Sequence, residues 1–325
     1  MRTERLRPDP AGLARAAAIL ARGGLVAFPT ETVYGLGALA LDPLAVRAIY
    51  AAKGRPATNP VIVHVPGAHE AAALAAAWPE AAARLAARFW PGPLTFVVPR
   101  GPGVPDEVTA GGPTVGLRAP AHPVAEALLR AVGAPIAAPS ANASEHVSPT
   151  TAEHVLADLD GRIDAVLDGG ACPVGIESTV LSLAGDAPRV LRPGALSRDD
   201  LAAALGVPVL GPGGPAEGAV AASPGLHHRH YAPAGKLVLV PRAGLAAALA
   251  AWPTPRGAIV RGAPPAGLGA EAVEVLPDEP AGYARGLYAA LRALEDRDCA
   301  AIAVEEAPAG AAWEAVRDRL ARAAG

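Results

Sequence analysis

Short apolar runs alternate with helical patterns through the first two thirds of the chain. Between several runs, apolar side chains recur at the spacing of one helix face, as in residues 46–50. The apolar runs span residues 25–28, 61–65, 94–98, 115–117, 136–138, 165–167, 180–183 and 190–191. An alternation of strands and helices is typical of an α/β domain, which we therefore expect from about residue 24 to residue 205.

Capping residues mark three helix starts within this region. Asp42–Pro43 predicts a helix that ends near residue 52, and Ser197–Asp200 predicts another that ends near residue 205. For the third, Ser148–Pro149 competes with a capping box at Thr150–Glu153. The sequence pattern does not decide between these two starts for the third helix.

A stretch rich in Gly, Pro and Ala separates this region from a second one. Residues 206–235 show no periodicity, which is typical of a linker or a functional loop. Beyond it, short apolar strands are separated or followed by helical stretches; the strands are expected at residues 237–240, 258–260, 273–276 and 301–304. We therefore expect three parts: an α/β domain over residues 1–205, a linker or functional loop over residues 206–235, and a small Rossmann-like α/β domain over residues 236–325.

Composition narrows the functional classes. Two distant cysteines, Cys172 and Cys299, provide neither a disulfide framework nor a zinc site, which favours a reducing compartment. Residues 1–10 lack the apolar core of a signal peptide, and no apolar run is long enough to span a membrane. We expect a cytoplasmic protein without membrane contact. The net charge of −3 gives no general attraction to nucleic acid, so direct tRNA binding stays open.

Common catalytic and nucleotide-binding motifs are absent, including the phosphate-binding P-loop, GxGxxG after a strand, HExxH and GxSxG. Polar residues instead follow the predicted strands, where open α/β sheets place ligands. PTETVYGLG at residues 29–37 carries Thr30, Glu31, Thr32 and Tyr34 directly after a strand. A polar turn is the alternative, but a turn needs glycine rather than this many hydroxyl groups.

The basic segment KGRPATNP at residues 53–60 predicts phosphate binding. Lys53 and Lys236 are the chain's two lysines among 28 basic residues, so a lysine next to Arg55 calls for an explanation. A point charge beside a guanidinium fork suits polyphosphate, and Asn59 adds a neutral donor and acceptor. The alternative is that both cations offset the dipole at a helix C-terminus, an effect of about 0.3 to 1 kcal/mol.

Two strands carry further candidates. In PVIVHV, His64 faces away from Val63 and its apolar neighbours, and it could equally be a hydrogen-bonded core residue. In TVGLRAPAHP, Thr114 and Arg118 share one face of a strand. Arg118 suits either a substrate carboxylate or a surface ion pair.

Weaker signals follow at other strand ends. APSAN contributes Ser140 and Asn142, GIESTV contributes Ser178, and RVLRPG contributes Arg192. Ser and Asn are also common in ordinary turns, so none of these motifs decides the function alone.

The histidine-rich segment LHHRHYAP, residues 226–233, invites a metal hypothesis. Its adjacent histidines point apart and no cysteine or acidic cluster flanks them, so we do not expect a metal site. A polar loop that folds over the site is favoured, with Arg229 and Tyr231 available for nucleotide contacts.

Taken together and in this order, these motifs resemble the YrdC-like family, and the linker with a second domain resembles its two-domain members, the threonylcarbamoyl-AMP synthases. The resemblance spans about residues 23–233. It implies a YrdC-like twisted open sheet with helices, and a reaction that joins L-threonine, bicarbonate and ATP into threonylcarbamoyl-AMP and diphosphate, for threonylcarbamoyladenosine on tRNA. A downstream tRNA threonylcarbamoyl transferase machinery is the implied partner.

The resemblance also implies residue roles. Lys53, Arg55, Ser140 and Asn142 match the basic and hydroxyl-amide quartet of the family, and we expect Lys53 and Arg55 to be its catalytic members. Threonine contacts fall on Thr32, His64, Arg118, the Ala138 backbone and Ser178. ATP contacts fall on Arg55, Asn59, Thr114, Ser140, Asn142, Ser148, Arg192 and Tyr231. We expect no protein-held metal, because Mg²⁺ commonly travels on the ATP phosphates and waters.

One departure and two alternatives accompany the resemblance. Residues 145–147 replace the more frequent Gly-Lys-Pro, which weakens phosphate contacts from that loop. A non-catalytic RNA-binding module of the same family is the first alternative, against which the net charge and the scarcity of aromatic residues count. A hydrogenase-maturation enzyme acting on carbamoyl phosphate is the second, and the cysteine count excludes its zinc fingers.

Overall fold

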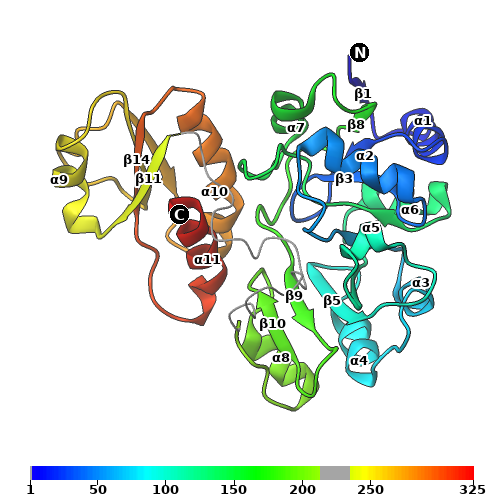
Figure 1. The fold of residues 1–325 in the computed structure, drawn as a ribbon. Helices are drawn as coiled ribbons and strands as arrows, with labels where there is room; N and C mark the ends of the chain where they lie inside the picture. Colours follow the sequence, from blue (N-terminus) through cyan, green and yellow to red (C-terminus); the bar gives the residue numbers. More distant parts are fainter. Residues whose placement is uncertain (1, 213–234) are drawn as a thin grey trace. The chain divides into compact units, whose positions relative to one another are not determined.

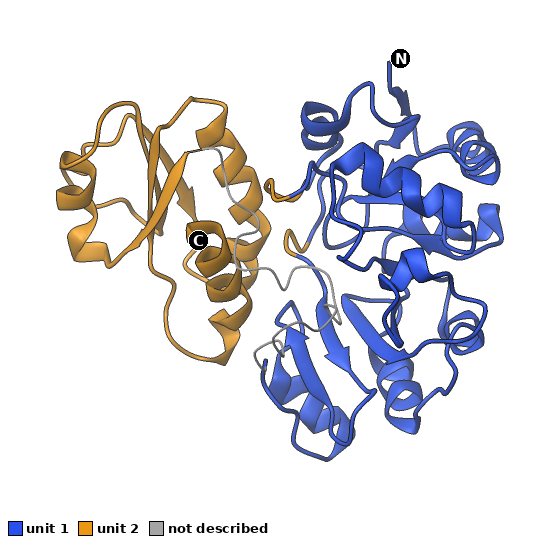
Figure 2. Ribbon diagram, in the orientation of Figure 1, with its two compact units in different colours: residues 1–144, 149–173, 177–226 blue, residues 145–148, 174–176, 227–325 orange. Residues whose placement is uncertain are grey.

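A computed structural model describes residues 2–212 and 235–325. The chain divides into two compact units, coloured separately in Figure 2. The first contains most of the chain up to the linker; the second contains the described chain from residue 235 together with residues 145–148 and 174–176. The expected linker falls mostly on residues 213–234, which lie outside the described residues.

The first unit is built on a mixed, ten-stranded sheet with the strand order β1-β8-β2-β3-β7-β4-β6-β5-β9-β10 (Figure 1). Its strands are β1 (Glu4–Leu6), β2 (Val26–Phe28), β3 (Gly35–Leu39), β4 (Ile62–His64), β5 (Leu94–Pro99), β6 (Thr114–Arg118), β7 (Ile136–Ala137), β8 (Ala165–Leu167), β9 (Thr179–Ser182) and β10 (Arg189–Arg192). The α/β class expected for this region is confirmed.

Strand direction is not uniform across this sheet. β4 and β6 are parallel. β5 and β9 are parallel to each other, β5 is antiparallel to β6 and β9 is antiparallel to β10, so β10 runs in the same direction as β6. β7 is antiparallel to β4, and β2 shares the direction of β7 through β3. The carboxyl ends of β2 and β7 therefore point away from those of β4, β6 and β10.

Eight helices accompany this sheet among the described residues. They are α1 (Pro10–Ala21), α2 (Pro43–Lys53), α3 (Ala68–Ala73), α4 (Glu80–Phe89), α5 (Asp106–Thr109), α6 (Pro123–Val132), α7 (Ala152–Leu159) and α8 (Arg198–Leu205). α1 and α6 pack on Val26 and Phe28 of β2, whereas Ala27 faces the larger core formed with α2, α4, α7 and α8. Because successive side chains of β2 point to opposite faces of the sheet, this strand contributes to the apolar layers on both faces.

One face of the central strands remains polar. Val63 of β4 and Leu117 of β6 join the larger core, together with Phe96 of β5. His64 and Arg118 point to the opposite face, because adjacent strand residues alternate, and the His64 ring lies edge-on to Phe28 with 6.0 Å between the ring centroids. The prediction that His64 faces away from its valine neighbours is confirmed, and this polar face forms the floor of the candidate site.

The second unit contains a small parallel sheet with the order β11-β14-β12-β13. Its strands are β11 (Lys236–Val240), β12 (Arg256–Arg261), β13 (Ala272–Leu276) and β14 (Ala301–Glu305), and its helices are α9 (Leu245–Ala250), α10 (Pro280–Glu295) and α11 (Glu314–Ala324). The four strands expected there are present with helices between and after them, and the Rossmann-like expectation is confirmed.

Local differences from the expectations have identifiable causes. Neither predicted start of α7 is correct, because the Thr151 hydroxyl caps the helix by accepting from the His154 amide. Asp9 caps α1, a helix the apolar pattern did not reveal. Gly35–Leu39, which lies outside the predicted apolar runs, forms β3. The capping box at Ser197–Asp200 is confirmed.

Candidate functional site

His64 and Arg118 lie side by side on the polar face, because they are register partners in the parallel pair β4 and β6. Both side chains are buried, with 4% of each residue exposed. Burial, followed by the nearby Arg118 charge, lowers the pKa of His64 to about 3. His64 is therefore a neutral imidazole at physiological pH, and Arg118 carries the positive charge of this pair.

Glu31 brings a negative charge to the same place. Its Oε1 lies 2.8 Å from Nη2 of Arg118, and both side chains are almost fully buried. β2, which precedes the Glu31 loop, is separated from β6 in the sheet by three strands and points the other way. The loop at residues 29–34 must therefore return across the sheet for this contact to form.

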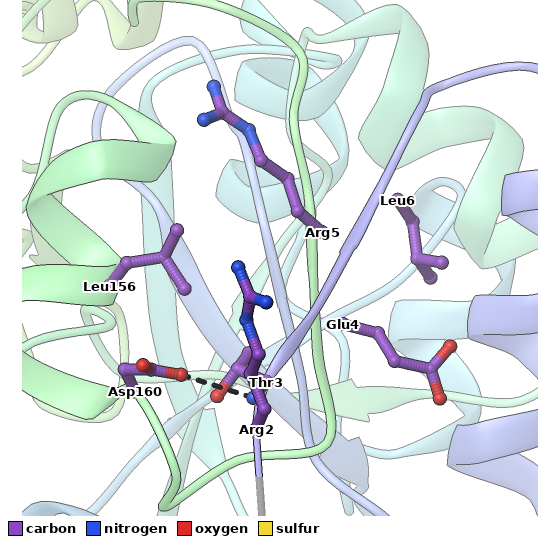
Figure 3. A pocket seen from close by; sticks show the side chains of 7 residues that line it. All are labelled: Arg2, Thr3, Glu4, Arg5, Leu6, Leu156 and Asp160. Carbon is purple, nitrogen blue, oxygen red and sulfur yellow. Dashed lines mark hydrogen bonds between the residues drawn. The ribbon is translucent and has the colours of Figure 1, made fainter.

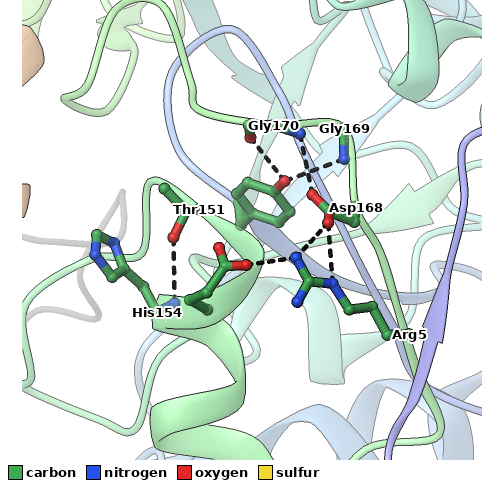
Figure 4. Close-up of polar contacts among 8 residues, drawn as sticks. Arg5, Thr151, His154, Asp168, Gly169 and Gly170 are labelled. Atoms are coloured by element: carbon green, nitrogen blue, oxygen red, sulfur yellow. Dashed lines mark hydrogen bonds and ion pairs between the residues drawn. The ribbon is translucent and has the colours of Figure 1, made fainter.

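Backbone and hydroxyl contacts hold that loop in place. Thr30 Oγ1 donates to the Val33 carbonyl at 2.7 Å and lies 2.8 Å from Thr32 Oγ1. The Tyr34 amide donates to the Pro149 carbonyl at 2.9 Å. The tyrosine hydroxyl donates to the Gly170 carbonyl at 2.8 Å, within the network drawn in Figure 4.

The segment at residues 168–170, which contacts the Tyr34 hydroxyl group, is held in turn by an ion pair. Gly170 N–H donates to Asp168, whose carboxylate also pairs with Arg5 of β1 (Figure 4). An edge strand therefore supports the loop that carries Thr32, a predicted threonine ligand.

A second hydroxyl cluster lies at the start of β9. Ser178 Oγ is 2.8 Å from Thr95 Oγ1 and accepts from Arg192 Nη2 at 3.3 Å. Arg192 also donates to the Ser178 carbonyl at 3.1 Å. The structure thus brings together Ser178 and Arg192, predicted as threonine and ATP ligands respectively.

Lys53 lies at the end of α2 with its ammonium group buried. Its Nζ donates to the Ser140 carbonyl at 2.6 Å and to the Asn142 carbonyl, and it lies 3.5 Å from Asn142 Oδ1. Burial, followed by the charge of Arg55, holds the pKa of Lys53 well below its ordinary value. Three of the predicted residues therefore meet here, and Lys53 ties the end of α2 to the loop after β7.

Arg55 and Asn59 organise the neighbouring turn. Arg55 Nε donates to the Asn59 carbonyl at 3.1 Å, and Nη2 donates to the Pro60 carbonyl at 2.8 Å. Asn59 Oδ1 is buried without a hydrogen-bond partner among the described residues. Such an oxygen costs about 1 to 3 kcal/mol, so this amide is a candidate ligand contact.

The remaining predicted residues lie farther apart. The Ala138 amide donates to the Ile62 carbonyl at 2.8 Å, next to His64. Thr114 begins β6 and Arg118 ends it, about 13 Å apart along the strand. Ser148 is fully buried and belongs to the second compact unit. Tyr231 lies outside the described residues.

One cavity lies away from this site. It measures about 600 Å³ beside β1 and α7 and contains none of the predicted ligands (Figure 3). Its lining is Arg2, Thr3, Glu4, Arg5, Leu6, Leu156 and Asp160. Within the described ranges, no group of three or more His, Cys, Asp or Glu side chains could hold a metal ion. No described helix combines the length and apolar character needed to cross a bilayer.

Two site features had not been assigned from the sequence. Glu31 had been noted without a role, and Thr95 had been counted as part of an apolar strand. A threonine inside the run LTFVV is the signal for the second; the Glu31 contact needs the fold, because it depends on strand order.

Comparisons with known proteins show the family to which the chain belongs. A family model described as telomere recombination, Sua5/YciO/YrdC, matches residues 18–194, and a model of the threonylcarbamoyl-AMP synthase C-terminal domain matches residues 196–325. The threonylcarbamoyl-AMP synthase of Bacillus subtilis (strain 168) is 48% identical over 238 residues, which is 73% of this chain and 69% of that protein.

A relative of the same name from Pyrococcus abyssi is 47% identical over 226 residues, 69% of this chain and 66% of that protein. The matched stretches thus span about two thirds of these relatives. The crystal structure of P. abyssi Sua5 complexed with L-threonine superposes with a TM-score of 0.92 at 37% identity, covering 100% of this chain and 98% of that one. With both domain models matched and a full-length structural counterpart, the chain belongs to the threonylcarbamoyl-AMP synthase family.

Proposed function

We propose that this chain is an L-threonylcarbamoyladenylate synthase, a nucleotidyltransferase that forms threonylcarbamoyl-AMP and diphosphate from L-threonine, bicarbonate and ATP. The observation that carries the proposal is the buried cationic group of Arg118, which lies beside the buried His64 on the polar face. Glu31 lies against this guanidinium, but Nε and Nη2 of Arg118 still lack a hydrogen-bond acceptor, which an amino-acid carboxylate supplies.

Threonine is assigned to the polar face of β4 and β6. Arg118 binds its carboxylate, and Thr32 or Ser178 hydrogen-bonds its hydroxyl group. Neutral His64 and the Ala138 backbone complete the cradle. The P. abyssi protein bound to L-threonine supports this assignment through its overall likeness to this chain.

ATP is assigned to the neighbouring basic and amide groups. Arg55 and Arg192 neutralise the phosphates, with Asn59 contributing an amide oxygen. The further contacts implied by the family are Thr114, Ser140, Asn142, Ser148 and Tyr231. Lys53 acts in this proposal through the loop it holds as well as through its charge, since its donors reach the Ser140 and Asn142 carbonyls.

The chemistry needs positioning and charge neutralisation rather than a protein nucleophile. The threonine amine combines with bicarbonate to give a carbamate and water; a carbamate oxygen then attacks the α-phosphorus and diphosphate leaves. Mg²⁺ bound to the ATP phosphates would neutralise part of their charge. Oxygen ligands suit Mg²⁺, and the arginine-rich surroundings fit a metal that arrives with its nucleotide.

The product would serve threonylcarbamoyladenosine formation on tRNA, through a downstream transferase. We place the protein in the cytoplasm, where ATP and tRNA meet. The family matches do not favour the RNA-binding alternative, and the buried Arg118 and His64 support a small-molecule substrate instead.

Diphosphate release by the purified protein tests the proposal. With ATP, Mg²⁺ and bicarbonate present, release should depend on added L-threonine, and Arg118→Leu should lower kcat/KM for threonine at least about 100-fold, because a buried charge-assisted contact is lost. Release that is the same with and without threonine would exclude the activity. Arg130→Leu, at an exposed ion pair on α6, is the matched control and should behave as the unaltered protein.

A further inference from the structure

Unpartnered polar atoms accumulate around the Glu31–Arg118 contact. Among all the described residues, nine buried side-chain atoms have no hydrogen-bond partner, and five of these nine belong to Glu31, Arg118 and His64. They are both carboxylate oxygens, two guanidinium nitrogens and the imidazole Nδ1. Native proteins leave few such atoms, since each costs about 1 to 3 kcal/mol.

The ion pair itself does not explain this arrangement. Glu31 and Arg118 approach to 2.8 Å, but the contact lacks hydrogen-bond geometry, so donors and acceptors of both groups remain available. A pair evolved only to neutralise itself would use the bidentate fork that arginine and carboxylate favour. The geometry points to a third group that hydrogen-bonds to the remaining acceptors of Glu31 and the remaining donors of Arg118.

That group must satisfy a buried cation and a buried anion at once. A zwitterionic α-amino acid does so, because one carbon atom carries both its carboxylate and its ammonium group. The lowered pKa of His64 keeps its imidazole uncharged. It therefore does not compete with Arg118 for the substrate carboxylate, and it does not repel the substrate ammonium group.

We propose that Glu31 binds the α-ammonium group of the amino-acid substrate while Arg118 binds its carboxylate. The inference rests on the proposed function and deepens it, by making a free α-ammonium group a requirement for binding. Amino acids are recognised; the corresponding 2-hydroxy acids, which lack the positive charge, are not.

Isothermal titration without ATP or bicarbonate tests this directly. The ligands are L-threonine and 2,3-dihydroxybutanoate, which replaces the ammonium with a hydroxyl group. The unaltered protein should bind threonine at least about tenfold more tightly than the hydroxy acid, as expected for one charge-assisted contact. Equal affinities would overturn the inference.

The variant Glu31→Gln separates ammonium binding from mere support of Arg118. Threonine affinity should fall about 10- to 100-fold while affinity for the hydroxy acid stays within about twofold, because only threonine offers the ammonium. If Glu31 only holds Arg118, both affinities fall together, and the inference is wrong. Glu70→Gln, an exposed carboxylate on α3, is the matched control and should leave both unchanged.

Different results would contradict the proposed synthase activity and the proposed role of Glu31. Selective threonine binding without threonine-dependent diphosphate release would remove the synthase activity and leave the ammonium site standing. Threonine-dependent release with no preference over the hydroxy acid would keep the activity and remove the role of Glu31. If Glu31→Gln does not fold, the comparison of the two ligands on the unaltered protein still tests whether binding requires the ammonium group.

Discussion

Replacing Lys53 by methionine separates its structural contacts from its proposed contact with phosphate. Met keeps an unbranched side chain of similar length, so little cavity forms. The change removes the ammonium that donates to the Ser140 and Asn142 carbonyls. Each buried carbonyl left without a donor costs about 1 to 3 kcal/mol, while relief of the buried charge offsets part of that cost.

We expect a net loss of about 2 kcal/mol in the free energy of unfolding of the first unit. For a unit of this size that corresponds to a fall in Tm of roughly 4 to 8 °C. Differential scanning calorimetry measures it, and Lys236→Met is the matched control, because the chain's other lysine is exposed on β11. Diphosphate release is measured on both variants well below their Tm.

Each outcome bears on a different part of the reasoning. A Lys53→Met protein as stable as the control would refute the claim that the ammonium holds the loop after β7. A destabilised but fully active variant would refute the phosphate role while leaving the structural role intact. Loss of both stability and activity is the expected result.

Three further predictions address other parts of the site. The free energy of unfolding should fall as pH drops from about 6.5 towards 3, by up to about 1.4 kcal/mol per unit from His64, which stays neutral when folded but binds a proton when unfolded; His64→Gln should flatten that slope in urea titrations. Thr95→Val removes the hydroxyl that contacts Ser178 and should raise KM for threonine severalfold with kcat nearly unchanged; an unchanged KM would exclude the link. Tyr34→Phe loses the hydroxyl contacts to Gly169 and Gly170 and should lower stability by about 1 to 2 kcal/mol in calorimetry; a change below about 0.3 would show that they contribute little.

Most of the secondary structure could be predicted from local sequence features. Apolar runs and caps located β4, α2 and α8 within about two residues, since burial and capping act over short distances. The apolar pattern does not predict β3, because glycines interrupt its apolar side chains. A Cβ on Gly37 would come within 2.9 Å of both Phe28 and Ile136, so packing within the sheet, rather than turn formation, requires that glycine.

The assembly of the site was less accessible from the sequence. The residues were expected at strand ends on the model of an open α/β sheet, but the sheet is mixed, and β2 and β7 end away from β4 and β6. Strand direction is a long-range property that no local pattern encodes. Glu31 reaches Arg118 because a loop crosses the sheet, and only the fold shows this contact.

A crystal structure of this protein with L-threonine and a non-hydrolysable ATP analogue tests the central claim most directly. The account predicts the threonine carboxylate within hydrogen-bond distance of Arg118, its ammonium against Glu31, and the phosphates beside Arg55 and Arg192. Threonine bound elsewhere, with Glu31 and Arg118 still facing only each other, would contradict it.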